Sequence, residues 1–321
     1  MNSLLRIHRS LPPASALAPS ALTIGNFDGV HRGHQAILEH VRQAAAQRAL
    51  VPAVMTFEPH PREYFALKAQ RPELAPTRIS TLRDKLWGLA QGGIRQVLLQ
   101  PFDAALAEMS ASDFIETLLV RGLRARWLLV GADFRFGNHR QGDLALLREA
   151  GARHGFEVET LQDVTDPDGH RVSSSEVRTA LAVGDLERAR LLLGRPYAIS
   201  GHVLHGQKLG RQLGYPTLNL RVPPRCAARS GIYVVRVHGL AEQPLPAVAS
   251  LGVRPTVEDG GRVLLEAHVL DTRVDAYGKL VRIEFLQLLR EEEKFPDLPA
   301  LVAAIDLDAR NARAYFSVHG L

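Results

Sequence analysis

Two histidines three residues apart follow the first apolar run of the chain. They belong to residues 25–34, which read GNFDGVHRGH and come directly after the apolar residues 21–24. Glycines let a backbone pass close to a ligand, and the unpaired N–H groups at the start of a helix favour anions. His31 and His34 share one face of the helix expected there, so both imidazoles can stabilise negative charge developing on a phosphate. The plainer interpretation is that two surface histidines begin a helix by accident.

The common sequence motifs for binding phosphates or metals are absent from the sequence. It has no Walker loop, no Gly-x-Gly-x-x-Gly, no His-Glu-x-x-His and no cysteine near the two histidines. We therefore expect phosphate chemistry without zinc at this segment.

A second candidate phosphate site combines the three serines at residues 173–175 with Arg178. Hydroxyls and N–H groups at the start of a helix beginning near Ser175, with an arginine one turn later, would form a cradle for an anion. A serine N-cap followed by an arginine in solvent explains the same residues equally well.

The most glycine-rich basic segment lies in the second half of the chain. Gly206, Gly210 and Gly214 recur every four residues, with Lys208 and Arg211 between them. Because so many glycines disfavour a helix, we expect a mobile cationic loop that folds over phosphates. A flexible surface loop without a ligand is the alternative.

Oxygen ligands for a metal come after this loop. Thr217 and Asn219 lie two residues apart, so on a strand they share a face. A hydroxyl beside an amide oxygen suits Mg²⁺, which takes oxygen ligands and keeps several waters. More often, such a pair is simply the polar face of a strand.

Glu266 is the lone carboxylate in residues 263–270, which are apolar apart from it and His268. Burying an unpartnered carboxylate is costly, so its presence needs a reason. One reason is a general base poised by desolvation. The other is a structural ion pair with Arg254 or Arg282.

Composition places these residues in an ordinary globular protein. The 321 residues carry a formal net charge of +5, and 46% are hydrophobic. The length predicts two domains, and the small positive excess suits phosphorylated small molecules better than nucleic acid. A single cysteine, Cys226, excludes an internal disulfide and favours a reducing compartment. No run approaches the ~20 apolar residues of a membrane helix, and prolines and arginines interrupt residues 1–22, so we expect a cytoplasmic protein without a secretory signal.

The elements that must position the candidates change type after Pro196. Before it, apolar runs alternate with segments of helical period, which predicts a parallel sheet with crossover helices. The expected strands are residues 21–24, 51–57, 96–100 and 127–130, and the expected helices are residues 35–48, 81–91 and 112–121. Two short helices over residues 175–193 should break at Gly184-Asp185.

After Pro196 the chain predicts an antiparallel barrel or sandwich that ends in a helix. The expected strands are residues 197–204, 231–237, 247–251, 263–270 and 280–288, and the terminal helix is residues 298–316.

Several of these segments resemble the bacterial bifunctional riboflavin kinase/FAD synthetase (FMN adenylyltransferase) family. Residues 25–34 are similar to the signature of nucleotidylyltransferases, and three further segments look like FAD synthetase motifs: residues 57–63, 130–137 and 171–178. Six later segments resemble successive riboflavin kinase signatures, in the same order: residues 216–219, 231–233, 252–256, 265–271, 277–278 and 289–292. The resemblance covers residues 22–316. It departs at Ser175, Leu218, Thr272 and Ala276, where the family usually has threonine, alanine, phenylalanine and leucine.

The resemblance implies an α/β protein with two activities. Residues 1–185 would form a Rossmann-like nucleotidylyltransferase sheet that adenylylates FMN to FAD. Residues 186–321 would form an antiparallel β-barrel with a terminal helix that phosphorylates riboflavin to FMN. ATP would be the co-substrate of both reactions, with Mg²⁺ as cofactor, and neither a nucleic acid nor a membrane is an expected partner. The oligomeric state does not follow.

The resemblance also implies a role for each candidate residue. Glu266 would be the catalytic base of the kinase, with Mg²⁺ held by Thr217 and Asn219, while His31 and His34 would stabilise the α-phosphate during adenylylation. The residues expected to hold ATP and its phosphates are Gly25, Phe27, Asp28, Gly33, Ser173, Ser174, Arg178, Gly206, Lys208, Gly210 and Arg211. Those expected to hold flavin are His60, Asp133 and Phe136.

Two other functions stay open on the residues alone. A monofunctional adenylyl- or cytidylyltransferase with a non-catalytic barrel would leave Thr217, Asn219 and Glu266 without a role. A nucleic-acid-binding protein would use the basic excess, but only 6% of the residues are aromatic, which argues against strand faces that stack bases.

Overall fold

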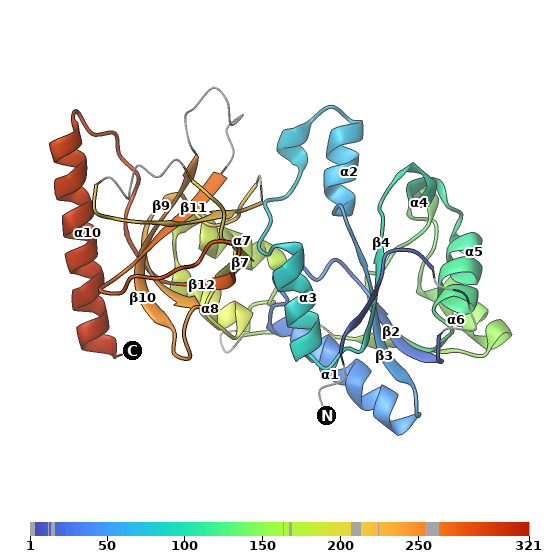
Figure 1. Cartoon of the computed structure of the whole chain (residues 1–321). Helices are drawn as coiled ribbons and strands as arrows, with labels where there is room; N and C mark the ends of the chain where they lie inside the picture. Colours follow the sequence, from blue (N-terminus) through green and yellow to red (C-terminus); the bar gives the residue numbers. More distant parts are fainter. Residues whose placement is uncertain are drawn as a thin grey trace. The chain divides into compact units, whose positions relative to one another are not determined.

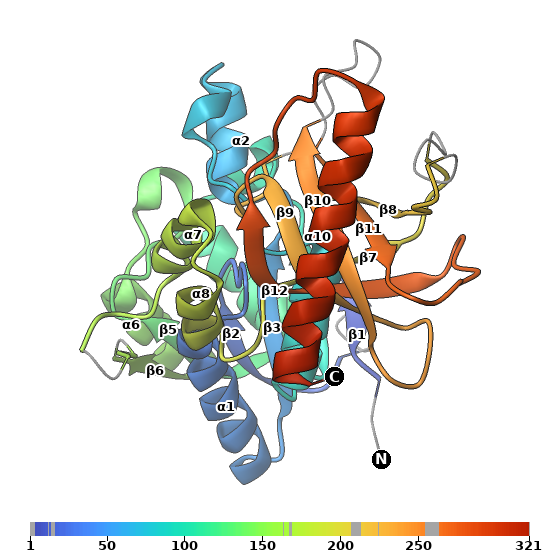
Figure 2. The same ribbon diagram turned by 90° about the vertical axis from the view of Figure 1, so that its left-hand side faces the viewer.

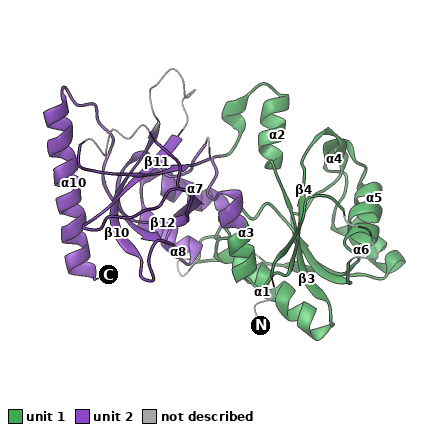
Figure 3. Ribbon diagram, viewed as in Figure 1, with its two compact units in different colours: residues 1–76, 86–172 green, residues 77–85, 173–321 purple. Residues whose placement is uncertain are grey.

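The computed structural model describes residues 4–11, 13, 17–162, 164–166, 169–206, 213–223, 225–253 and 263–320. The chain forms two compact units, coloured separately in Figure 3. Unit 1 comprises residues 1–76 and 86–172, and unit 2 comprises residues 77–85 and 173–321. The division of activities at residue 185 stays a prediction, because compactness does not report activity.

Unit 1 is built on a six-stranded sheet in the order β1-β4-β3-β2-β5-β6. Every neighbouring pair of strands in it runs parallel. The central strand β2 is buried along its whole length, as expected for a parallel sheet covered on both faces. The predicted parallel sheet is therefore confirmed. Its strands are β1 (Arg6–His8), β2 (Ser20–Ile24), β3 (Val51–Phe57), β4 (Gln96–Gln100), β5 (Ala125–Gly131) and β6 (Glu157–Leu161).

Helices cover both faces of this sheet (Figure 1). On one face, Leu38 and Val41 of α1 (Arg32–Gln47) share a buried cluster with strand residues Val54 and Val97. The helices that pack against the other face are α4 (Ala104–Glu108), α5 (Ala111–Asp113), the π-helix η3 (Phe114–Gly122) and α6 (Leu144–His154). The remaining helices before residue 173 are α2 (Pro61–Lys68), η2 (Pro72–Leu74), α3 (Leu82–Gln91) and η4 (Asn138–Arg140).

Unit 2 is built on an antiparallel sheet in the order β7-β12-β9-β10-β11-β8. A bridge between Leu204 and Asn219 joins the chain after β7 to β8, so the sheet curls towards a closed barrel. The predicted antiparallel barrel is confirmed. The strands are β7 (Ala198–His202), β8 (Leu218–Arg221), β9 (Gly231–His238), β10 (Leu245–Val253), β11 (Val263–Val269) and β12 (Leu280–Arg290).

The terminal helix α10 (Leu298–His319) packs on the outer face of the barrel (Figure 2). Ala309, Ala312 and Phe316 form a buried cluster with Val234 of β9 and Val248 of β10. The predicted terminal helix is thus confirmed and covers the face on which even-numbered residues of β10 lie.

Two short helices precede the barrel in unit 2, as the sequence predicts. Helix α7 (Ser174–Val183) ends at Gly184, whose φ of +80° is left-handed, and Asp185 caps α8 (Leu186–Leu193). The side chain of Asp185 accepts a hydrogen bond from the N–H of Arg188. Glycine after one helix and aspartate before the next are ordinary stop and start signals.

Candidate active sites

The GNFDGVHRGH segment forms a tight turn between β2 and α1 in unit 1. The Gly25 N–H donates to the carbonyl of Met55, and Thr56 Oγ1 donates to the carbonyl of Asn26. Phe27 and Gly29 have left-handed φ values of 49° and 84°. The turn is therefore held rigidly against β3, at the carboxyl ends of the strands where parallel sheets bind ligands.

His31 and His34 lie together at the start of α1. His31 caps the helix, and its Nδ1 accepts a hydrogen bond of 3.3 Å from the His34 N–H. The two rings stack with centroids 3.7 Å apart, and His31 is only 5% exposed. Because Nδ1 of His31 is an acceptor, its neutral ring carries the proton on Nε2, which can donate to a phosphate oxygen. The predicted pairing of both imidazoles on one helix face is present.

The other predicted ligands in this segment are interior residues. Phe27 and Asp28 are each 1% exposed, and a Cβ on Gly25 would lie 3.1 Å from the Phe27 ring. Gly33 is buried too, and a Cβ there would meet the Val172 carbonyl oxygen at 3.1 Å and the His31 ring at 3.2 Å. These residues shape the turn, and its backbone rather than the Phe27 ring is the part suited to an anion.

The predicted flavin residues of unit 1 occupy three different environments. His60 caps α2, its Nδ1 accepting from the Arg62 N–H, and is 6% exposed. Phe136 is buried and lies 5.1 Å from the Phe114 ring within the core cluster. Asp133 is exposed in the turn after β5. The position of each residue in the fold is explained without a bound flavin, and their role in flavin binding stays a prediction.

The serines and arginine of the second candidate site begin α7 in unit 2. The helix starts at Ser174, one residue before the position predicted. Ser173 Oγ accepts from the Glu176 N–H at 3.2 Å, so this hydroxyl is a helix cap. Arg178 does not simply extend into solvent, because its Nε donates to the Thr77 carbonyl at 2.7 Å.

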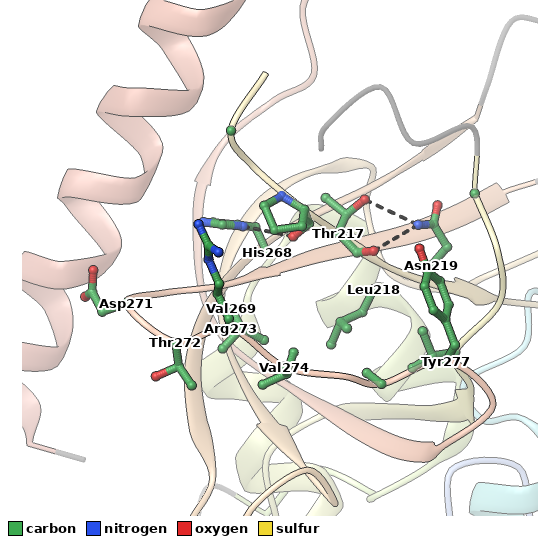
Figure 4. A pocket seen from close by; sticks show the side chains of 15 residues that line it. Thr217, Leu218, Asn219, His268, Val269, Asp271, Thr272, Arg273, Val274 and Tyr277 are labelled. Atoms are coloured by element: carbon green, nitrogen blue, oxygen red, sulfur yellow. Dashed lines mark hydrogen bonds between the residues drawn. The ribbon is translucent and has the colours of Figure 1, made fainter. Parts of the chain in front are cut away.

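A cavity of about 710 Å³ lies beside β8 in unit 2 (Figure 4). The Asn219 Nδ2 group donates to the carbonyl and the Oγ1 of Thr217, at 3.2 and 3.3 Å. A Cβ on Gly206 would lie 2.6 Å from Asn219 Oδ1, so a larger residue there would have to displace the Asn219 side chain. The cavity is also lined by Tyr277, whose ring stacks 4.0 Å from that of His205.

The donor set at this cavity fits a magnesium ion. Asn219 is 6% exposed, and its Oδ1 is buried without a hydrogen-bond partner. Such an oxygen beside a threonine hydroxyl matches the preference of Mg²⁺ for hard oxygen ligands. The described residues contain no cluster of three or more His, Cys, Asp or Glu that could hold a metal by itself.

A second cavity, of about 390 Å³, lies between the barrel face and α10. Glu266 lines it, and Thr217 and His268 line both cavities. In the strand register Glu266 stands opposite Asn219 on one side and Ser250 on the other. Directly opposed residues of antiparallel strands share a face, so the predicted metal ligand and the predicted base are neighbours.

Ser250 and Glu292 join this group, although the sequence assigned neither a role. Ser250 Oγ donates to Glu292 Oε1 at 3.0 Å. Glu292 is exposed at the surface, but partial desolvation of its carboxylate raises its pKa, and the charge of Glu266 raises it further. A Cβ on Gly252 would overlap the Glu292 carboxylate, so glycine makes room for it. Only the strand register, which a single sequence does not specify, could have placed Ser250 beside Glu266.

Two arginines were the alternative ion-pair partners expected for Glu266. Arg282 lies on β12, with its Nε 3.6 Å from Glu284. Arg254 lies outside the described residues, as do three predicted phosphate ligands of the glycine-rich loop, Lys208, Gly210 and Arg211.

Comparison with known proteins adds an independent line of observation. A family model described as FAD synthetase matches residues 14–176, and one described as riboflavin kinase matches residues 193–316. A bifunctional riboflavin kinase/FMN adenylyltransferase of Escherichia coli (strain K12) is 45% identical over 297 residues, which are 92% of this chain and 93% of the relative. One from Pseudomonas fluorescens is 47% identical over 292 residues, which are 91% of each chain.

A solved structure shares the fold over nearly the whole chain. It is described as the crystal structure of a macrolide-efflux protein from Streptococcus pneumoniae, and it aligns with a TM-score of 0.76 at 29% identity. The alignment covers 96% of this chain and 98% of that one. In the part of the present chain that the structure describes, no helix is both long and apolar enough to span a bilayer.

Proposed function

Because the chain belongs to the bifunctional riboflavin kinase/FMN adenylyltransferase family, we propose that the groups described above carry its two reactions. The enzyme phosphorylates riboflavin to FMN and adenylylates FMN to FAD. The barrel of unit 2 supplies the groups for the first reaction, and the turn before α1 together with the start of α7 supplies those for the second.

Phosphorylation is assigned to the two cavities of unit 2, with ATP in the larger and riboflavin in the smaller. The observation that carries this assignment is the cross-strand pairing of Asn219 with Glu266 where both cavities share Thr217. A general base must lie near the hydroxyl that it deprotonates, and the phosphate must lie near the same oxygen. The apolar lining of the smaller cavity, which includes Ile232, suits an isoalloxazine ring.

The kinase reaction then proceeds by a direct phosphoryl transfer. The ribityl 5′-oxygen of riboflavin bonds to the γ-phosphorus as the bond from that phosphorus to the ADP oxygen breaks. The hydroxyl proton passes to the Glu266 carboxylate. Asn219 Oδ1 and Thr217 Oγ1 would hold Mg²⁺, which when bound offsets negative charge on the triphosphate. The loop containing Gly206, Lys208, Gly210 and Arg211 adds positive charge.

Adenylylation is assigned to the residues that resemble nucleotidylyltransferase motifs. An oxygen of the FMN phosphate bonds to the α-phosphorus of ATP, and pyrophosphate leaves. The nucleophile is already anionic and needs no base. His31 and His34 donate to the charge that gathers on the α-phosphate, above the backbone turn shaped by Gly25, Phe27, Asp28 and Gly33. Ser173, Ser174 and Arg178 restrain the pyrophosphate, and His60, Asp133 and Phe136 border the flavin.

The experiment that tests both assignments is chromatography of the products made from riboflavin and MgATP. His31→Ala should accumulate FMN. Glu266→Ala should slow FMN formation by about 10²- to 10⁴-fold, as for removal of a general base, but still make FAD when supplied with FMN. Matched controls are His40→Ala and Glu242→Ala, which change exposed residues of the same types. Loss of both reactions in either test variant would contradict separate catalytic groups.

We also propose that the enzyme acts in the cytoplasm. The support is its single cysteine, Cys226, which has no second cysteine in the chain with which to form a disulfide.

A further inference from the structure

Helix α7 carries groups proposed for adenylylation, yet it is built into the unit that contains the barrel. Ser173, Ser174 and Arg178 all belong to unit 2, which also contains residues 77–85. The two family models leave residues 177–192 unmatched. The contacts that hold α7 must therefore be found in the structure of unit 2.

The loop before β9 holds the C-terminal end of α7. The Arg229 N–H donates to the Leu181 carbonyl at 3.0 Å, and Arg229 Nη1 approaches the Val183 carbonyl at 3.4 Å. The last carbonyls of a helix lack partners within it and carry partial negative charge, so a cation there is favourable. Leu288 of β12 fills the space beside Gly184, where a Cβ would lie 2.6 Å from its Cδ2.

Arg229 is itself fixed from two directions. Its Nη2 pairs with Glu291, and its carbonyl accepts a hydrogen bond from the hydroxyl of Tyr233. Tyr233 is fully buried, and burial raises the pKa of its hydroxyl, which stays protonated as a donor. The backbone of Arg229 is thus tied to β9, and its guanidinium is tied to the residue directly after β12.

The same loop also holds the segment that Arg178, in the middle of α7, contacts. Arg178 Nε donates to the Thr77 carbonyl. The next residue, Arg78, is bonded on both sides to this loop: its N–H donates to the Arg225 carbonyl at 2.6 Å, and its carbonyl accepts from the Ala227 N–H at 2.9 Å. Residues 225–229 therefore position both the end of α7 and the segment that orients Arg178.

We propose that Arg229 is a positioning residue for adenylylation: it fixes α7 on the barrel so that Ser173, Ser174 and Arg178 meet the leaving pyrophosphate. Arg229 acts through the helix and touches no substrate. The inference rests on the proposed role of those three residues. Small displacements of groups that bind a reacting phosphate reduce rates strongly. The hydrogen bonds of Arg229 run to α7, to Glu291 and to Tyr233, whereas the paired kinase groups Asn219 and Glu266 lie on β8 and β11.

The experiment measures both reactions in full-length Arg229→Gln, Arg229→Lys and Arg178→Ala. The matched control is Arg190→Gln, which breaks an exposed ion pair with Glu187 elsewhere in unit 2. Arg229→Gln should lower kcat/KM for ATP in FAD formation about 10-fold, leave KM for FMN unchanged, and keep riboflavin phosphorylation within about twofold. Arg229→Lys, which retains the charge, should recover part of the loss.

A double mutant separates positioning from general destabilisation. If Arg229 acts through Arg178, Arg229→Gln added to Arg178→Ala should cause much less than a further 10-fold loss, because coupled residues are not additive. Parallel loss of both reactions in Arg229→Gln, or full additivity with Arg178→Ala, would overturn the proposal. Unchanged FAD formation in Arg178→Ala would overturn the proposed role of Arg178 at the pyrophosphate. Slower FAD formation in Arg178→Ala together with a normal rate in Arg229→Gln would overturn only the positioning role of Arg229.

Discussion

Glu292 is a carboxylate whose protonation is linked to the stability of unit 2. Partial desolvation of this exposed side chain and the nearby charge of Glu266 raise its pKa above the ordinary 4.5. A carboxyl with a raised pKa binds its proton more tightly in the folded than in the unfolded chain. Its charged form therefore destabilises the fold at pH values above the raised pKa, and this effect disappears as the pH falls towards 4.5.

Glu292→Gln should consequently raise the melting temperature at pH 8 by only about 1 °C, because solvent screens the charge of this exposed carboxylate. Glutamine keeps an oxygen that can accept from Ser250 but removes the charge. The advantage should shrink steadily as the pH is lowered towards the ordinary pKa of a glutamate. Melting curves across this range check it, with Glu242→Gln on the surface as control. A lower melting temperature at pH 8 would show that the Glu292 charge is stabilising.

Some residues of the group around Glu266 can be predicted from the sequence, and others cannot. Strand periodicity places Thr217 and Asn219 on one face, and a lone carboxylate in an apolar strand marks Glu266. Ser250 and Glu292 carry no such signal, because they join the group through strand pairing between segments far apart in sequence. The interior positions of Phe27 and Asp28 are equally hidden, since their burial depends on the tertiary fold of the turn.

At the end of α7, both the backbone conformation and a close side-chain contact favour glycine at residue 184. Gly184 has a φ of +80°, and a Cβ would meet Leu288 at 2.6 Å. Gly184→Ala should therefore destabilise unit 2 by about 1–3 kcal/mol, from the left-handed backbone and the close contact together. Gly320→Ala is the matched control, because its φ is +69° and nothing lies within 4 Å.

Urea denaturation of both variants separates the two contributions. Gly320→Ala reports the backbone effect alone, and Leu288→Ala combined with Gly184→Ala should relieve the contact. Equal losses in Gly184→Ala and Gly320→Ala would mean that the barrel yields to the added methyl group.

Element type was predictable where a periodic apolar pattern coincides with a cap. The break at Gly184-Asp185 and the long helices α1 and α10 are such cases. β1 and β6 were missed because they are edge strands without a buried run. The predicted helix at residues 112–121 is π-helical from Phe114, with the Leu123 N–H donating to the Leu118 carbonyl, a difference that periodicity cannot detect.

For the whole molecule, the unexpected feature is the membership of residues 77–85 in unit 2. The pattern change after Pro196 predicts two architectures, but residues 77–85, which run into the helix predicted at 81–91, give no sign that they belong with the later one. Asp84 is one of its anchors: its Oδ2 accepts from the Ser200 N–H at 3.0 Å and from Thr81 Oγ1 at 2.6 Å. Burial lowers the pKa of Arg195 to about 10, and the negative charge of Asp84 opposes this decrease by stabilising the charged guanidinium.

Asp84→Ala should therefore loosen the barrel, although residue 84 lies in the first half of the sequence. Amide hydrogen exchange should accelerate at Ser200 by about 10- to 100-fold, the equivalent of losing a charged hydrogen bond, while amides of β2 and β3 keep their protection. Asp103→Ala is the control: it removes a similar carboxylate bond, to the Leu106 N–H, in unit 1. Faster exchange in β2 with an unchanged Ser200 would contradict the assignment of this segment.

Residues 77–85 also constrain the order of events on the ribosome. This segment is synthesised before the strand residues of unit 1 at 96–100 and long before residues 225–227, with which Arg78 pairs. At roughly 5–20 residues per second, it waits about 7–30 s for its partners. If the first sheet assembles during synthesis, it does so while the final hydrogen bonds of this segment do not yet exist, and translation pauses in this interval should lengthen its exposure to proteases and chaperones.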